Sequence, residues 1–143
     1  MKYLPLLLLL LGCAKLPLGT IDPELQPYKD LFMEECSARI VNCGGVKYIS
    51  LTFMPIERSN LLGSCYKEGN IRSITVSPAR WKYLNAGGRE QLVMHEYGHC
   101  FLDREHLDDK ANGNPVSLLT TYQMDGAVYL ANREYYLTEL FAR

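Results

Sequence analysis

The sequence has almost no net charge, few histidines and no long apolar segment. Its 15 Lys and Arg residues against 16 Asp and Glu residues give a formal charge of −1. This balance excludes the basic surface typical of a nucleic-acid-binding protein. The leucine run Leu6–Leu11 is too short to span a bilayer as a helix, which needs about 20 residues. The chain after this run contains no internal repeat and no low-complexity stretch, so fibrous and repeat architectures are excluded.

What is present fits one globular domain with both helices and strands. The 143 residues are 48% hydrophobic and 22% charged, close to the globular average. Apolar spacing predicts a helix over 28–41, and alternation predicts a central strand over 46–54 and a hairpin from 61–66 and 71–77. Further helices are expected over about 89–102, with Gly88 as N-cap, and over 127–142, with an irregular segment at 107–123 between them. This order predicts the α+β class.

The N-terminus has the features of an export signal. Lys2 precedes the leucine run, and residues 1–12 fit a signal peptide. The following Leu10-Leu11-Gly12-Cys13 resembles a bacterial lipobox, which implies an acylated Cys13 as the mature N-terminus. Residues 13–27, with three prolines, then form a tether, and 28–143 the folded domain. The alternative is an ordinary secretory signal cut after Ala14.

Both interpretations place the domain outside the cytoplasm. The absence of Asp after Cys13 favours, by resemblance to sorted bacterial lipoproteins, an outer-membrane destination within the cell envelope. The only membrane contact expected is through the N-terminal lipid.

The cysteine count agrees with export. Without Cys13, four cysteines remain, which allow three pairings, and an oxidising compartment favours two disulfides. We favour Cys36–Cys43, because this pair is local. The second bond, Cys65–Cys100, would then clamp a strand to the helix of residues 89–102. Buried free thiols are the alternative.

The helix over 89–102 carries the strongest chemical signal, His95-Glu96-Tyr97-Gly98-His99. Histidines four apart lie on one face of a helix and can bind one metal ion. Zinc suits imidazole nitrogen, and three protein ligands leave a position for water. Glu96 can then take a proton from a zinc-bound water that attacks a peptide carbonyl. Gly98 costs helix stability, which suggests a reason such as a close backbone approach under the site.

His106 is the natural third ligand. All three histidines of the chain fall between 95 and 106, and the chain must turn after Leu102 to bring His106 back. The alternatives are Glu105, or a glutamate of the last helix, Glu134 or Glu139, because carboxylates also bind zinc.

The segment HEYGHCFLDREH resembles the metzincin clan of zinc peptidases. Leu102 replaces the turning glycine of that clan, and His106 lies one residue late. It is similar to a group of small bacterial, often lipidated metallopeptidases with the pattern H-E-x-G-H-C-x-L-x-R-x-H, and the similarity extends loosely over 61–143. The resemblance implies a minimal zincin-like domain, with a small twisted sheet packed on the active-site helix and with N- and C-terminal helices. It also implies a methionine turn at Met124.

Several other residues have two interpretations. One of the tyrosines Tyr122, Tyr129, Tyr135 and Tyr136 can stabilise a transition state, although packing explains most of them. Asp103, Asp108 and Asp109 can orient a ligand imidazole, or they form a solvated loop.

The sequence therefore predicts a monomeric, lipid-anchored peptidase with one Zn²⁺ ion and a peptide or protein substrate. An edge strand near 61–77 would pair with extended substrate. One alternative is a non-catalytic zinc-binding envelope lipoprotein with a structural, binding or immunity role. Another is an immunity or adhesion module that retains a relic active site.

Overall fold

The computed structural model describes residues 18–40, 42–57 and 60–142. In chain order, the elements are α1 (Gln26–Arg39), the 3₁₀ helix η1 (Gly44–Tyr48), β1 (Ser50–Phe53), β2 (Gly63–Glu68), β3 (Ile71–Val76), α2 (Pro78–Trp81), α3 (Ala86–Cys100), β4 (Lys110–Ala111), β5 (Asn114–Pro115), α4 (Gly126–Ala131) and α5 (Arg133–Phe141). The α+β class is confirmed at this level. In the described part of the chain, no helix is both apolar enough and long enough to traverse a bilayer.

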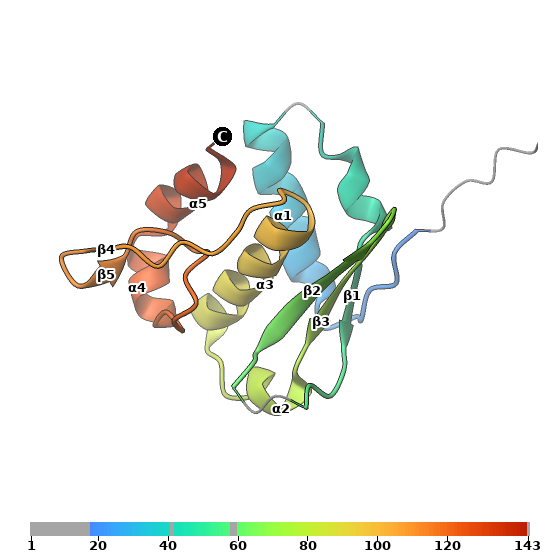
Figure 1. Ribbon diagram of the computed structural model, residues 1–143, viewed down its shortest axis with the longest axis horizontal. Coiled ribbons are helices and arrows are strands. Elements are labelled where there is room, and N and C mark those ends of the chain that lie inside the picture. The colour runs from blue at the N-terminus through green and yellow to red at the C-terminus, as the bar shows by residue number, and fades with distance from the viewer. Residues whose placement is uncertain (1–17, 41, 58–59, 143) are drawn as a thin grey trace, which may run out of the picture.

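The main sheet has the strand order β1-β3-β2 (Figure 1). β3 is parallel to β1 and antiparallel to β2, with Cys65 opposite Ile74. The predicted hairpin is therefore confirmed. The prediction of 46–54 as a central strand is wrong, because its first residues form η1 and β3 takes the centre of the sheet. Alternation still describes β1 correctly, since Leu51 is fully buried.

The chain before α1 packs against the outer border of β1. Leu51 N donates to Thr20 O (2.8 Å), and Asp22 N donates to Leu51 O (3.0 Å). Leu25 is fully buried. Packed structure thus begins before residue 28, where the sequence led us to place the start of the domain.

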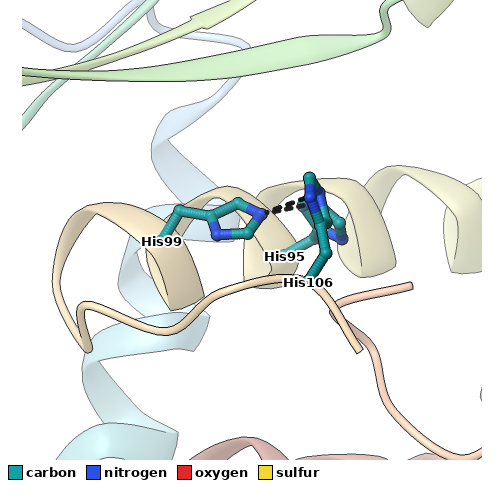
Figure 2. A group of neighbouring side chains, drawn as sticks. All are labelled: His95, His99 and His106. Atoms are coloured by element: carbon teal, nitrogen blue, oxygen red, sulfur yellow. Dashed lines mark hydrogen bonds between the residues drawn. The ribbon is translucent and has the colours of Figure 1, made fainter. Parts of the chain in front are cut away.

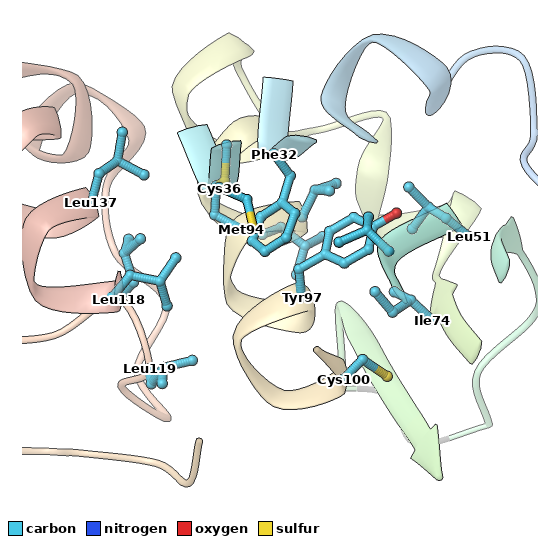
Figure 3. Close-up of a cluster of buried hydrophobic side chains, with 14 of the residues drawn as sticks. Phe32, Cys36, Leu51, Ile74, Met94, Tyr97, Cys100, Leu118, Leu119 and Leu137 are labelled. Carbon is cyan, nitrogen blue, oxygen red and sulfur yellow. The ribbon is translucent and has the colours of Figure 1, made fainter. Parts of the chain in front are cut away.

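Helices α1 and α3 lie side by side between the sheet and the C-terminal helices (Figure 1). Phe32 of α1 stacks on Tyr97 of α3, with ring centroids 4.4 Å apart. Figure 3 shows this pair between two side chains of the sheet, Leu51 and Ile74, and the leucines Leu118, Leu119 and Leu137. Because these side chains are buried almost completely, they fix the position of α3, which carries the HExxH motif.

Helix boundaries differ from the prediction where polar side chains act as caps. Helix α3 begins at Ala86, because the Asn85 side chain accepts a hydrogen bond from Gly88 N (2.8 Å); Gly88 is therefore not the N-cap. The single helix expected over 127–142 is two helices, α4 and α5, since the backbone at Asn132 leaves the helical region. The segment 107–123, expected to be irregular, contains the short hairpin β4–β5, and α2 was not predicted.

Both predicted disulfides are present. Cys36–Cys43 joins the C-terminal end of α1 to the residue before η1, and Cys65–Cys100 joins β2 to the last residue of α3. The first closes a sequence separation of 7 residues and the second one of 35. The second bond therefore attaches the sheet directly to the helix of the HExxH motif.

Candidate metal centre

Three imidazoles converge at the C-terminal half of α3 and the loop after it (Figure 2). His99 Nε2 lies 3.0 Å from His95 Nε2 and 3.2 Å from His106 Nε2. The ligand atoms of the three side chains all lie within 4.8 Å of one another. The structure thus brings together the three histidines that the sequence nominated as ligands.

Two of these imidazoles have a fixed tautomer. His95 Nδ1 lies 2.7 Å from Leu118 O, and His99 Nδ1 lies 2.6 Å from Arg104 O. A backbone carbonyl oxygen only accepts hydrogen bonds, so each Nδ1 carries the proton and donates it. Both Nε2 atoms are therefore left with a free lone pair, and the two lone pairs face each other.

The donor set fits a zinc ion. Facing lone pairs at this distance repel unless a cation or proton lies between them, whereas Zn²⁺ bound tetrahedrally at 2.0–2.1 Å would separate two nitrogens by about 3.3 Å. The two observed separations, 3.0 and 3.2 Å, are close to that value. Burial lowers the pKa of His95 to about 4 and is also the main cause that lowers the pKa of His99. Neutral imidazoles are the form that binds metal.

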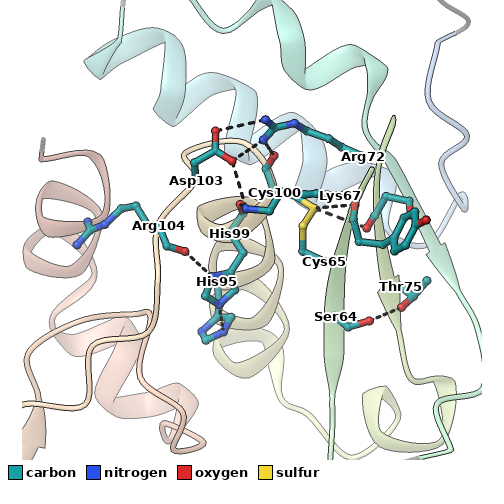
Figure 4. The surroundings of a disulfide bond; sticks show 12 residues. Ser64, Cys65, Lys67, Arg72, Thr75, His95, His99, Cys100, Asp103 and Arg104 are labelled. Atoms are coloured by element: carbon teal, nitrogen blue, oxygen red, sulfur yellow. Dashed lines mark hydrogen bonds and ion pairs between the residues drawn. A yellow bond between two sulfur atoms is a disulfide. The ribbon is translucent and has the colours of Figure 1, made fainter. Parts of the chain in front are cut away.

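His106 reaches the site because the chain reverses at the end of α3. Asp103 adopts a positive φ of 53°, which few residues other than glycine tolerate but Asp does. Its carboxylate accepts hydrogen bonds from Arg72 and Lys67 of the β2–β3 hairpin, at 2.9 and 3.2 Å (Figure 4). Arg72 also donates to Cys100 O. The turn is thus held by the same hairpin that the disulfide of Cys100 anchors.

Glu96 lies on α3, between the two histidines of the motif. Glu96 is only 4% exposed, and burial alone raises the pKa of its carboxyl to about 8. A Cβ placed on Gly63 of β2 would lie 2.8 Å from Glu96 Oε1. The start of β2 therefore needs glycine to leave room for this carboxylate, a requirement that the sequence did not reveal.

The cleft around these residues has a volume of about 530 Å³. One wall comes from residues 60–62 and the start of β2, the floor from α3, and the other wall from residues 104–106 and 120–123. The histidines thus sit at the bottom of a groove with the sheet border on one side.

The other nominated residues occupy different places. Glu134 is bound to Arg39, and Glu139 to Arg104 and Ser117, so neither glutamate joins the histidines. Glu105 lines the cleft but does not belong to the cluster of potential ligands. Met124 is 4% exposed and lies just before Asp125, the N-cap of α4; its role in a methionine turn stays a prediction. Cys13 lies outside the described residues.

Among the four nominated tyrosines, only Tyr122 lines the cleft. The hydroxyls of the other three donate to Glu90 and to the carbonyls of Val116 and Pro115, which gives them a packing role. Asp108 accepts hydrogen bonds from Thr121 N (2.6 Å) and Thr121 Oγ1 (2.8 Å), and these contacts lower its pKa. Asp108 therefore holds loop backbone, Asp103 binds the side chains of Arg72 and Lys67, and Asp109 is exposed.

The chain matches no family model, no curated protein and no solved structure. The resemblance to metzincins therefore stays a prediction that rests on the motif residues. Gly98 is closely approached, but by side chains and not by the backbone that we expected: a Cβ there would lie 2.7 Å from Leu119 Cδ2 and 3.0 Å from Leu140 Cδ1. Sequence reasoning missed the carbonyls of Arg104 and Leu118, because any residue type can supply a backbone oxygen.

Proposed function

We propose that the protein is a zinc-dependent peptidase of minimal zincin-like architecture that hydrolyses peptide bonds. The observation that carries this proposal is the convergence of three imidazole Nε2 atoms in an open cleft beside a buried glutamate. A zinc ion, when bound, supplies Lewis acidity, which polarises a carbonyl and acidifies water. A purely structural site would have no use for the glutamate or for the open side.

Glu96 is the proposed general base and acid. Its carboxylate takes a proton from the attacking water as the oxygen bonds to the carbonyl carbon. The same proton then passes to the amide nitrogen as the C–N bond breaks. Burial raises the pKa of Glu96 to about 8 in the metal-free protein, and the positive charge of a zinc ion in the site would lower this pKa. A group that both accepts and donates a proton near neutral pH works best with a pKa close to that pH.

Extended peptide is the substrate form that the cleft favours. Among the described residues, β2 pairs only with β3, so its other border has free backbone groups. The start of this strand lines the cleft beside Glu96. A substrate added as a further strand would place successive carbonyls along the groove.

The location that we propose is the bacterial envelope, with a lipid on Cys13 as the anchor. The two disulfides support an oxidising compartment. The formal charge of −1 supports a protein or peptide partner rather than nucleic acid.

The test is a digest of a peptide library by the zinc-loaded protein, with products identified by mass spectrometry and zinc measured by metal analysis. Glu96→Gln is expected to retain one zinc ion and to lower cleavage at least about 100-fold, because the general base is removed. Glu105→Gln is the matched control, since Glu105 lines the same cleft without a proposed role.

Two results would contradict the proposal. Equal cleavage by wild type and Glu96→Gln would assign the activity to a contaminant. Stoichiometric zinc without any cleavage would instead support the non-catalytic zinc-binding lipoprotein.

A further inference from the structure

Two of the three histidines depend on backbone carbonyls that come from outside α3. His99 donates to the carbonyl of Arg104, which belongs to the segment that returns His106. His95 donates to the carbonyl of Leu118, which lies in the segment before α4. The orientation of each imidazole therefore depends on how firmly the segment that carries its carbonyl is held in place.

A single carboxylate on α5 binds both segments. Glu139 Oε1 accepts a hydrogen bond from Arg104 Nη2 (2.5 Å), and Glu139 Oε2 accepts one from Ser117 Oγ (2.7 Å). Figure 4 shows Arg104 with its carbonyl on the histidine side and its guanidinium directed toward α5. One carboxylate thus lies behind both carbonyl-bearing segments.

The Ser117 contact also fixes the orientation of the Leu118 carbonyl. Ser117 Oγ accepts a hydrogen bond from Leu119 N (3.0 Å) while it donates to Glu139. This bond closes a small turn with Leu118 at its centre. Leu107 N donates to Leu119 O (2.8 Å), which ties the segment after Arg104 to the same turn. Residues 117–119 are fully buried, so no solvent replaces these contacts.

We propose that Glu139 is a positioning residue of the metal centre, because it locks the two segments whose carbonyls hold the Nδ1–H groups of His95 and His99. This role deepens the proposed function and rests on it for its purpose. Glu139 does not line the cleft and does not belong to the histidine cluster. Its effect reaches the imidazoles through Arg104 on one side and through Ser117 on the other.

The contacts of Glu139 with Arg104 and with Ser117 are not equally important. Arg104 also donates to the carbonyls of Glu139 (2.5 Å) and Leu140 (2.9 Å) at the end of α5, so it keeps two contacts when the carboxylate is lost. Ser117 Oγ has only the Glu139 carboxylate as acceptor among the described residues. Loss of the carboxylate should therefore disturb His95 more than His99.

The test measures zinc affinity and the imidazole hydrogen bonds separately. Zinc Kd is obtained by competition with a chelator, and the Nδ1–H resonances of His95 and His99 are recorded by ¹H–¹⁵N NMR in metal-free and zinc-loaded protein. Glu139→Ala should weaken zinc binding about 10-fold, the lower end of the range for groups that orient ligands. It should also shift or broaden the His95 resonance most.

Three further variants separate positioning from general stability. Glu139→Gln retains one acceptor for Arg104 and should restore part of the affinity. Ser117→Ala should alter the His95 resonance and leave that of His99 in place. Glu134→Ala is the matched control. Glu134 also lies on α5 and also pairs with an arginine, Arg39 of α1, at 2.8 Å from its Nη2, but it contacts neither segment. This variant should change neither the zinc affinity nor the resonances.

The proposal is overturned if Glu139→Ala has the same zinc affinity and the same two imidazole resonances as Glu134→Ala. If Glu139→Ala does not fold, Ser117→Ala and Glu139→Gln are compared with Glu134→Ala in its place. If the wild type binds no zinc, the proposed function fails, but the resonances of the metal-free protein still decide the role of Glu139. If zinc binds without hydrolysis, the Kd values decide it equally well.

Discussion

The part of the chain up to Cys100 and the part after it are held together by different means. The first part contains the main sheet, α1 and α3, and both disulfides lie within it. The second part contains no cysteine, and side chains such as Glu139 and Asp108 hold its loops through hydrogen bonds. The histidine cluster lies where the two parts meet.

This difference separates the tasks of the site residues. The first part supplies His95, Glu96 and His99 from one regular helix. The second part supplies His106 and the carbonyls that direct two of the imidazoles. A metal ion at the site would therefore join a cross-linked half to a half held by polar contacts.

The largest effect is expected from removing the ligand that the second part contributes. A structural zinc site is worth about 10–16 kcal/mol, so one of three protein ligands should contribute about 3–5 kcal/mol, or about 1000-fold in Kd. His106→Ala should lose that affinity, measured by chelator competition, while the metal-free protein keeps its Tm. Glu105→Gln should keep the affinity, and the reverse result would make Glu105 the ligand.

The next largest effect is the loss of stability when either disulfide of the first part is removed. Chain-entropy arguments give about 4 kcal/mol for a loop of the length closed by Cys65–Cys100 and about 2 kcal/mol for that closed by Cys36–Cys43. Double Cys→Ser variants at each bond, unfolded with urea, should show that order of destabilisation. Only loss of Cys65–Cys100 should also weaken zinc binding, because this bond anchors the end of α3. Equal zinc affinity in both variants would contradict that link.

The smallest effect concerns the turn between the two parts. Hydrogen bonds from Arg72, and then from Lys67, lower the pKa of Asp103. A lowered folded pKa means that the contribution is present above about pH 4 and disappears as the pH falls through the folded value. Since the Asp103 side chain is 57% exposed, the contribution should stay below about 1 kcal/mol.

Asp103→Asn keeps a residue type that tolerates positive φ. It should remove this pH dependence, which urea unfolding between about pH 2.5 and 6 measures, because an unperturbed Asp carboxyl titrates near pH 4. An unchanged pH profile would show that the Arg72 and Lys67 contacts contribute nothing to stability.

Prediction from the sequence succeeded best for features that lie within one helix, one strand or one short stretch of chain. The spacing of His95 and His99 placed both on one helix face, and the local pair Cys36–Cys43 was identified from its separation. Alternation located β1 and the hairpin, but it did not show that β3 is central, because strand order depends on which border each strand presents to its neighbours. Element ends moved where one side chain, such as Asn85, acts as a cap.

The second part of the chain was least predictable. Its positions are set by contacts between residues far apart in sequence, such as Arg104 with Glu139 and His95 with Leu118. The sequence presents Glu139 only as a possible ligand, because no sequence feature distinguishes a glutamate that coordinates a metal from one that forms an ion pair. Gly63 gave no signal either, since its requirement comes from a neighbour 33 positions along the chain, Glu96.

The segment at residues 20–22 determines where the sheet can grow. It satisfies the backbone of β1 on its outer border, and Asp22 Oδ2 accepts a further bond from Phe53 N at 2.5 Å. Exposed strand borders invite copies of a protein to associate, and here that route is blocked at β1. Any self-association through the sheet must then use the β2 border, so a molecule engaged with peptide in its groove would be protected from aggregating through that border.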